Sequence, residues 1–167
     1  MIRRLGSHTG RKIVFGYDRY LSDELDSYLA VLASHGEVSL AVDSDSLHYL
    51  SSAQRVCERV RGRADAVGVL LCSTGMGMSI AANKFSGIYA ARCVSVDDAT
   101  MARSINNCNV VCLALRSTLE LNARIIEAFM TTAYEGRKLE QLSRITLLEN
   151  DMAPIETPRV RPHVKSV

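Results

Sequence analysis

Residues 66–84 read AVGVLLCSTGMGMSIAANK, and this stretch decides the fold. Ala66–Leu71 is an uninterrupted apolar run of the kind found in a buried strand, and Cys72 follows it directly. Gly75 and Gly77 then predict a tight turn, after which a helix begins. In an open α/β sheet, ligands bind where the carboxyl end of a strand meets the start of a helix. The stretch therefore predicts an α/β fold with a thiol at its ligand-binding edge.

Apolar runs and amphipathic segments alternate on both sides of this stretch. Five segments predict strands: Lys12–Tyr17, Glu37–Val42, Ala66–Cys72, Ile88–Val94 and Asn109–Leu115. Helical spacing of apolar residues predicts further helices at Asp23–Ser34, Tyr49–Val60, Asp97–Ile105, Thr118–Thr132 and Arg137–Glu149. Near-continuous apolar strands joined by helical crossovers imply a parallel sheet that is covered on both faces. We therefore expect a three-layer α/β/α sandwich around a five-stranded parallel, Rossmann-like sheet.

The chain divides into three regions by composition. Residues 1–11 carry charge and glycine without an apolar period, and we expect a flexible extension there. Residues 12–150 hold the predicted strands and helices and form a single expected domain. All three prolines lie in residues 151–167, which predicts an irregular tail.

Bulk composition argues against several classes of function. The net charge of +2 is too small to indicate nucleic acid, and no apolar run approaches the roughly 18 residues of a membrane span. The five cysteines are odd in number, and their spacing fits no zinc site. Without a secretory signal, reduced thiols in a cytoplasm are the expectation. We expect no zinc site, no nucleic acid and no membrane among the partners.

Cys72 is the first candidate for chemistry. Taken alone, a cysteine at the end of an apolar strand is more often a buried structural thiol. The turn at residues 73–77 favours the chemical interpretation, because unpaired amides at a helix start stabilise a thiolate and a developing oxyanion. Such a thiolate can take up and return a proton near neutral pH. The glycines do not indicate a nucleotide, because a third glycine is absent and Lys84 is out of register for a phosphate loop.

Polar residues near other strand ends are each open to two interpretations. Asp18 follows the first strand and should share an edge with Cys72, as a ligand contact or as a helix-capping or turn aspartate. Asn106 precedes the fifth strand, where asparagine commonly forms turns, although its amide could hold sugar hydroxyls. Arg137 opens the last helix and is by default a solvated charge. Among the four histidines, His48 is the one near a predicted edge.

The chain resembles the family of sugar-phosphate isomerases that comprises ribose-5-phosphate isomerase B and galactose-6-phosphate isomerase. Over residues 12–149 the order and spacing of its motifs match that family, with only a small deletion near Gly136. The segment Cys72–Lys84 carries most of the resemblance, because it is close to the family's Cys-Gly-Thr-Gly-x-Gly-x-Ser-x-Ala-Ala-Asn-Lys. Shorter segments support it: Phe15–Asp18, Asn106 with Asn109–Val110, Tyr134–Arg137 and Ile145–Glu149.

The resemblance implies a homodimer or tetramer with sites at the subunit boundary. It also implies an aldose–ketose interconversion through a cis-enediolate, without metal or cofactor. Cys72 would be the base that moves a proton between the first two carbons, and Thr74 would assist it. Other residues would hold the enediolate oxygens, the sugar and its phosphate. The substrate-binding residues implied in this way are Asp18, Arg19, Tyr49, Ser73, Gly75, Gly77, Ser79, Asn106 and Arg137.

Several positions depart from the family pattern. Arg19 replaces the histidine after the first-strand aspartate, and His48 replaces the aspartate of an Asp-Tyr-Pro segment. Ser73 replaces the glycine that follows the cysteine. Ile105 stands in place of the histidine that opens the furanose ring, and Gln141 in place of a second phosphate-contacting arginine. The proton-transfer half of the site is therefore retained, whereas the ring-opening half and part of the phosphate clamp are not.

Two hypotheses follow from the residues and the resemblance together. The first is an isomerase that uses Cys72 on a small sugar phosphate of the ribose 5-phosphate type or on a four-carbon analogue. A four-carbon substrate fits the lost histidine, because its blocked terminal hydroxyl cannot close a stable furanose. The second is a non-catalytic or half-site sugar-phosphate-binding subunit that needs a paralogous partner. Turnover by the purified homomer separates the two.

Overall fold

The structure is a computed structural model that describes residues 4–21, 23–42 and 47–149. Its strands are β1 (Lys12–Tyr17), β2 (Val38–Leu40), β3 (Ala66–Cys72), β4 (Ala90–Arg92) and β5 (Val110–Ala114). Its helices are α1 (Leu25–Ala33), α2 (Tyr49–Val60), α3 (Met76–Ala82), α4 (Val96–Ser104), α5 (Leu119–Thr131) and α6 (Leu139–Leu148), with a short 3-10 turn, η1 (Arg19–Leu21).

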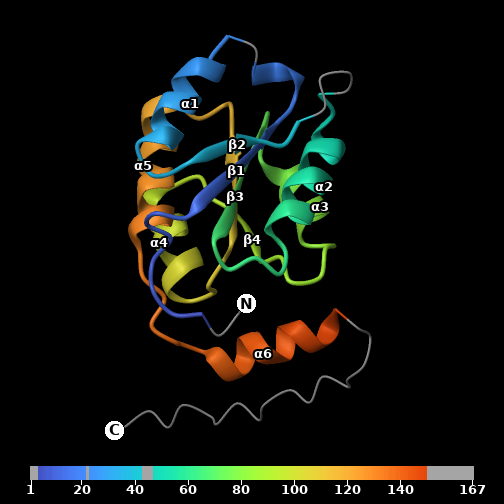
Figure 1. Ribbon diagram of the computed structural model, residues 1–167, viewed down its shortest axis with the longest axis vertical. Helices are drawn as coiled ribbons and strands as arrows, with labels where there is room; N and C mark the ends of the chain where they lie inside the picture. Colours follow the sequence, from blue (N-terminus) through green and yellow to red (C-terminus); the bar gives the residue numbers. More distant parts are fainter. Residues whose placement is uncertain (1–3, 22, 43–46, 150–167) are drawn as a thin grey trace, which may run out of the picture.

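The strands form one parallel sheet in the order β2-β1-β3-β5-β4 (Figure 1). β3 is the central strand: it pairs with β1 on one side and β5 on the other, and all seven of its residues are buried. Because the strands are parallel, their carboxyl ends meet at one edge of the sheet, and Cys72 lies at that edge. The five-stranded parallel α/β sheet predicted from the sequence is confirmed.

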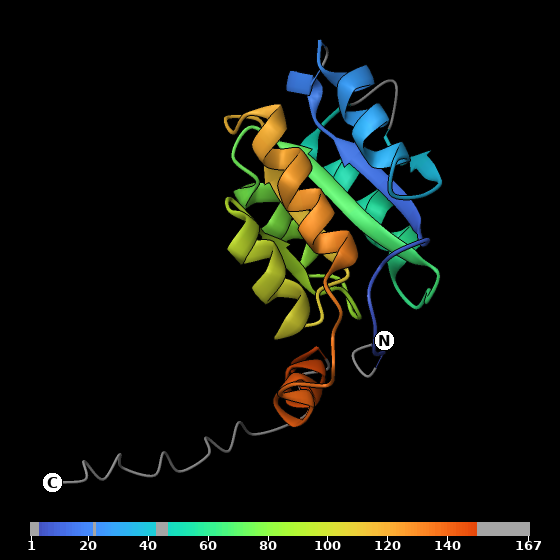
Figure 2. The same cartoon turned by 90° about the vertical axis from the view of Figure 1, so that its left-hand side faces the viewer.

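Helices cover both faces of the sheet. α2 and α3 lie on one face, and α1, α4 and α5 lie on the other (Figures 1 and 2). α2 approaches the sheet closely because two strand positions are glycine. A Cβ atom at Gly68 would lie 2.8 Å from Cγ1 of Val56, and one at Gly16 would lie 2.7 Å from Cγ2 of the same valine. This close approach brings the start of α2 to the same edge as Cys72.

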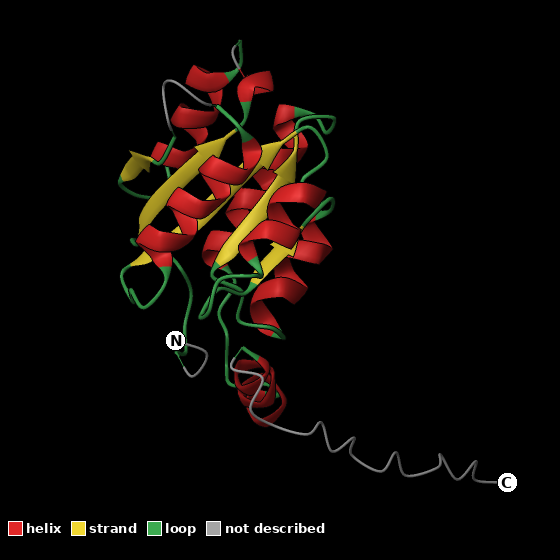
Figure 3. Cartoon of the chain, turned by 90° about the vertical axis from the view of Figure 1, so that its right-hand side faces the viewer, coloured by secondary structure: helices red, strands yellow, loops and turns green. Residues whose placement is uncertain are grey.

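Helix α6 lies apart from the three layers, beyond the amino ends of the strands, as Figures 1 and 3 show. Its Leu142 is buried against Tyr134, and the partly buried Tyr89 packs against this pair. Glu149 accepts hydrogen bonds from the backbone amide of Gly87 at 2.9 Å and from the hydroxyl of Ser86 at 2.5 Å. α6 is therefore fixed at the edge opposite Cys72.

Element boundaries agree best with the sequence where both sides of an element are packed. β1, α2 and β3 span the predicted residues. β2 and β4 have three residues each, fewer than predicted, because they are edge strands that pair on one side only. α6 begins at Leu139 instead of Arg137, because Lys138 has a left-handed backbone with φ of 57° and cannot continue a helix.

Residues 4–11 do not form the loose extension that the sequence predicts. Gly6 pairs with Tyr134 in an antiparallel bridge, with N···O distances of 2.9 and 3.1 Å. The side chain of His8 is 1% exposed and lies 2.9 Å from the carbonyl of Cys108. Arg103 is fully buried and donates to the carbonyl of Gly6 at 3.0 Å. A buried guanidinium needs acceptors, and the segment supplies one, which holds it against the domain.

The predicted irregular tail, residues 151–167, lies outside the described residues. Within the described ranges, no helix has the length and apolar character needed to cross a bilayer.

Candidate active site

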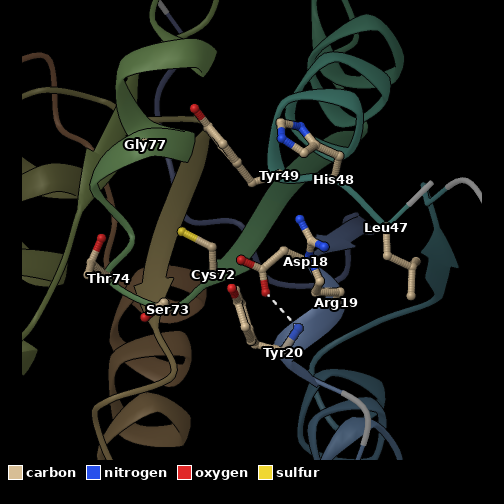
Figure 4. Close-up of a pocket in the computed structure, with 10 residues that line it drawn as sticks. All are labelled: Asp18, Arg19, Tyr20, Leu47, His48, Tyr49, Cys72, Ser73, Thr74 and Gly77. Carbon is tan, nitrogen blue, oxygen red and sulfur yellow. Dashed lines mark hydrogen bonds between the residues drawn. The ribbon is translucent and has the colours of Figure 1, made fainter.

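A pocket of about 320 Å³ opens at the carboxyl ends of β1 and β3, beside the start of α2. Figure 4 shows the side chains that surround it. The lining residues are Asp18, Arg19, Tyr20, Leu47, His48, Tyr49, Cys72, Ser73, Thr74 and Gly77. The pocket therefore lies where an open α/β sheet binds its ligand.

Cys72 is the last residue of β3, and its side chain is held by the turn that follows. Its Sγ accepts a hydrogen bond from the backbone amide of Gly75 at 3.2 Å, although only 6% of the residue is exposed. Gly75 has a φ of 72°, which side chains disfavour, and a Cβ there would lie 3.0 Å from the carbonyl oxygen of Leu113. A glycine is therefore required for the amide to reach the sulfur.

Thr74 connects this turn to the sheet edge. Its Oγ1 accepts a hydrogen bond from the amide of Met76 at 3.3 Å, so the hydroxyl proton is available to another acceptor. Its carbonyl oxygen accepts from Nε of Arg92, the last residue of β4, at 2.7 Å. The loop that follows β3 thus lies over the end of β5, and the Arg92 side chain of β4 holds it in place.

Asp18 follows β1, and its carboxylate lines the same pocket as the Cys72 sulfur (Figure 4). The backbone amide of Asp18 donates to Leu71 at 3.1 Å, which extends the pairing of β1 with β3 by one residue. Its Oδ1 accepts from the amide of Tyr20 at 3.1 Å. The side chain thus forms a local turn and also faces the pocket, and its contact with a ligand stays a prediction.

His48 and Tyr49 form the pocket wall at the start of α2. Nδ1 of His48 caps the helix by accepting from the amide of Leu50 at 3.3 Å, which leaves the proton of the neutral ring on Nε2. The two rings pack in a tilted arrangement, with centroids 4.7 Å apart and an interplanar angle of 35°. A Cβ at Gly77 would lie 3.0 Å from the Tyr49 ring, so this glycine makes room for the tyrosine. Ser52 anchors α2 by donating to the carbonyl of Tyr17 at 2.6 Å.

The other four cysteines are buried and do not line the pocket. Burial raises the pKa of the Cys57, Cys93 and Cys108 thiols to about 12, and it raises the pKa of Cys112 as well. All four are neutral thiols at physiological pH. Across the part of the chain that the structure describes, no three His, Cys, Asp or Glu side chains group closely enough to hold a metal ion.

The pocket brings together most of the residues predicted from the sequence: Asp18, Arg19, Tyr49, Cys72, Ser73, Thr74 and Gly77. Gly75 lies in the adjoining turn, and Ser79 donates its hydroxyl to the carbonyl of Met76. Asn106 and Arg137 are not brought to this pocket. Asn106 is an exposed turn residue at the amino end of β5, and Arg137 is exposed before α6.

Three residues of the site were not found by sequence reasoning. Tyr20 and Leu47 line the pocket, and Arg92 holds the loop. Each lies at or just beyond a strand end on the same edge as Cys72, or at a helix start there. The parallel topology was the signal that could have found them, because it brings these ends together.

Comparisons with known proteins agree on one family. A family model described as Ribose/Galactose Isomerase matches residues 13–146. Ribose-5-phosphate isomerase B of Escherichia coli (strain K12) is 34% identical over 144 residues, which are 83% of this chain and 97% of that protein. The DNA damage-repair/toleration protein DRT102 of Arabidopsis thaliana is 35% identical over 129 residues, which cover 75% of this chain but 41% of that longer protein. The structure of a mutant of ribose 5-phosphate isomerase type B from Trypanosoma cruzi superposes with a TM-score of 0.80 and 28% identity, covering 87% of this chain and 100% of that one.

Proposed function

Because this chain belongs to the ribose/galactose isomerase family, we propose that it interconverts the aldose and ketose forms of a small sugar phosphate. One observation carries the proposal. The Cys72 sulfur faces a pocket of substrate size while it accepts a hydrogen bond from the Gly75 amide at 3.2 Å. A donor in this position stabilises a thiolate, and a thiolate is the form that abstracts a proton.

In the proposed reaction, the Cys72 thiolate takes the proton from carbon 2 of the open-chain aldose. The electron pair of that C–H bond forms a double bond between carbons 1 and 2, and the oxygen on carbon 1 becomes an enediolate oxygen. A second proton passes from the oxygen on carbon 2 to the oxygen on carbon 1, assisted by the Thr74 hydroxyl, whose own oxygen is held by Met76. The thiol then returns its proton to carbon 1 as the carbonyl forms on carbon 2. Every step uses a group of this chain and needs no redox partner.

The remaining pocket residues have proposed roles in binding. The Asp18 carboxylate and the Tyr49 hydroxyl bind sugar hydroxyls, and Ser73 and Gly77 bound the pocket on the opposite side. Arg19 lies exposed at the rim and provides a cation for a phosphate group. His48 presents an Nε2–H group from the helix start. We propose that this N–H group donates to the ring oxygen of a cyclic substrate.

We propose a substrate of four or five carbons. Ile105, which stands where the family has its ring-opening histidine, caps α4 and is not part of the pocket. A four-carbon aldose phosphate needs no ring opening, whereas ribose 5-phosphate would rely on His48. Turnover of the two substrates by a His48→Gln variant distinguishes these cases.

A second copy of the chain is proposed to complete the site. Asn106 and Arg137 are exposed and lie away from the pocket that contains Cys72. Their role in binding the sugar and its phosphate therefore requires that they reach the pocket of a neighbouring copy. We propose a homodimer or tetramer on this ground.

The direct test is turnover of four-, five- and six-carbon aldose phosphates by the purified protein. We expect turnover that Cys72→Ala abolishes and that Cys57→Ala, a change at a buried thiol in α2, leaves nearly intact. In heavy water, deuterium should enter carbon 1 of the ketose formed, because the proton passes through an exchangeable thiol. Full turnover by Cys72→Ala would contradict the mechanism. No turnover of any substrate by the wild type would favour a binding role or a missing partner subunit.

A further inference from the structure

Arg92 is a partly buried cation that stands behind the loop carrying Cys72. It ends the edge strand β4, and its Nε donates to the carbonyl oxygen of Thr74 at 2.7 Å. Its Nη2 is buried and has no hydrogen-bond partner among the residues that the structure describes. The guanidinium therefore directs one strong, charge-assisted hydrogen bond at this loop.

The acceptor of that bond belongs to a peptide group that also contacts the proposed base. The carbonyl of Thr74 and the amide of Gly75 are the two ends of one planar peptide unit. The oxygen end accepts from Arg92 at 2.7 Å, and the N–H end donates to the Cys72 sulfur at 3.2 Å. Arg92, the Thr74–Gly75 peptide and Cys72 thus form a continuous chain of hydrogen bonds from a guanidinium to a thiol.

We propose that Arg92 is a positioning residue that stabilises the thiolate of Cys72 through the Thr74–Gly75 peptide. A cation on the carbonyl oxygen polarises the peptide, and a polarised peptide is a stronger N–H donor. The same bond fixes the plane of the peptide, so that its N–H stays directed at the sulfur. The inference depends on the proposed role of Cys72 as base, but the thiol can be examined without any substrate.

The surroundings of Cys72 explain why a buried cation matters there. The groups that face it from the packed elements are Asp18, Arg19 and Tyr20 after β1, His48 and Tyr49 at the start of α2, Cys112 on β5 and Arg92 on β4. Asp18 is a buried carboxylate, and its negative charge disfavours a thiolate at Cys72. Helix α3 contributes no charged side chain. Arg19 is exposed at the rim, where solvent screens it. Arg92 is the cation that is coupled to the sulfur by hydrogen bonds.

The test is the rate of alkylation of Cys72 by iodoacetamide as a function of pH, followed by mass spectrometry of the peptide that contains it. The four other cysteines are buried and do not line the pocket, and a Cys72→Ala sample gives the background. We expect Arg92→Leu and Arg92→Gln to move the midpoint of the alkylation profile upward by roughly half to one pH unit. Arg92→Lys, which keeps the charge with a different reach, should recover part of that shift.

Arg59→Leu is the matched control, because Arg59 also donates to a backbone carbonyl at 2.7 Å, that of Leu40 in β2, and neither residue lines the pocket. Its profile should stay that of the wild type. If Arg92→Leu does not fold, the glutamine and lysine variants still decide the question. A midpoint unchanged in folded Arg92→Gln or Arg92→Leu would overturn the inference and leave the isomerase proposal standing. Turnover by Cys72→Ala would instead overturn the isomerase mechanism, whatever the alkylation profiles show.

Discussion

Gly75 meets two constraints that can be separated by experiment. Its φ of 72° disfavours any side chain, and its Cβ position lies 3.0 Å from the backbone oxygen of Leu113, which cannot move aside. Gly62 has the same φ of 72°, but a Cβ there meets nothing within 4 Å. The two positions therefore differ in crowding and share the same backbone conformation.

We expect Gly62→Ala to lower the free energy of unfolding by about 1 kcal/mol and Gly75→Ala to lower it by about 3 kcal/mol. The larger loss reflects the contact with Leu113, and turnover should fall as well because the amide moves away from the Cys72 sulfur. Urea denaturation of both variants measures the difference. Equal losses at the two glycines would show that the contact with Leu113 is unimportant.

The close packing of α2 on the sheet depends on two glycines, Gly16 and Gly68, in the strands beneath it. A Cβ at Gly68 would lie 2.8 Å from Val56 and 2.9 Å from Val110, both less than real contacts allow. We expect Gly68→Ala to cost about 2 kcal/mol by overpacking. Adding Val56→Ala should cost less than the sum of the single changes, because the valine methyl that meets the new atom is gone. A double-mutant cycle by denaturation measures this coupling, and strictly additive costs would argue against the close approach.

The segment of residues 4–11 is sensitive to acid because of His8. Burial, together with the Arg103 charge, lowers the pKa of His8 from 6.5 to about 3. The neutral ring is the form that the fold accommodates, so its stabilising contribution is complete above pH 6.5 and is lost as the pH falls toward 3. We expect the free energy of unfolding to fall in that window by up to about 1.4 kcal/mol per pH unit from this residue.

His8→Gln keeps a side chain that can donate to the carbonyl of Cys108 but does not titrate, so the acid slope should become shallower. Chemical denaturation at a series of pH values measures the slope, and His35→Gln, a change at the end of α1, serves as the control. An identical slope in wild type and His8→Gln would contradict the assignment.

The sequence predicts elements best where an apolar pattern reports burial directly. β3 and α2 were predicted to the residue because one is buried throughout and the other buries a regular stripe. β2 and β4 were predicted too long, since apolar residues continue beyond the few that pair with a neighbour. Parallel topology predicted that Asp18 and Cys72 share an edge of the sheet, whereas Tyr49 was predicted from the family resemblance. Arg92 was not predicted, because its role depends on a carbonyl acceptor supplied by a distant loop, which no local pattern records.

For the molecule as a whole, the proposed sharing of sites between copies has a direct consequence. Cys72→Ala and Arg137→Ala should each be inactive or nearly so. Mixing them under conditions that exchange subunits should restore activity, because in a hybrid dimer one of the two sites has both residues intact. Random exchange of equal amounts restores about a quarter of the wild-type rate. Mixtures that stay as inactive as the separate variants, with exchange confirmed, would contradict a site shared between copies.

The bridge between Gly6 and Tyr134 joins a segment that is synthesised early to one that is synthesised late. Its two partners are separated by most of the chain, and each accepts the other's amide. Because the chain leaves the ribosome amino end first, the bridge from Gly6 can form only after Tyr134 has been made. Arg103 and Cys108 are made earlier than Tyr134, so their contacts with Gly6 and His8 can form before the bridge does. A nascent chain shorter than 134 residues is thus expected to hold its amino end by these contacts alone, and so more weakly than the finished protein, although its sheet is already complete.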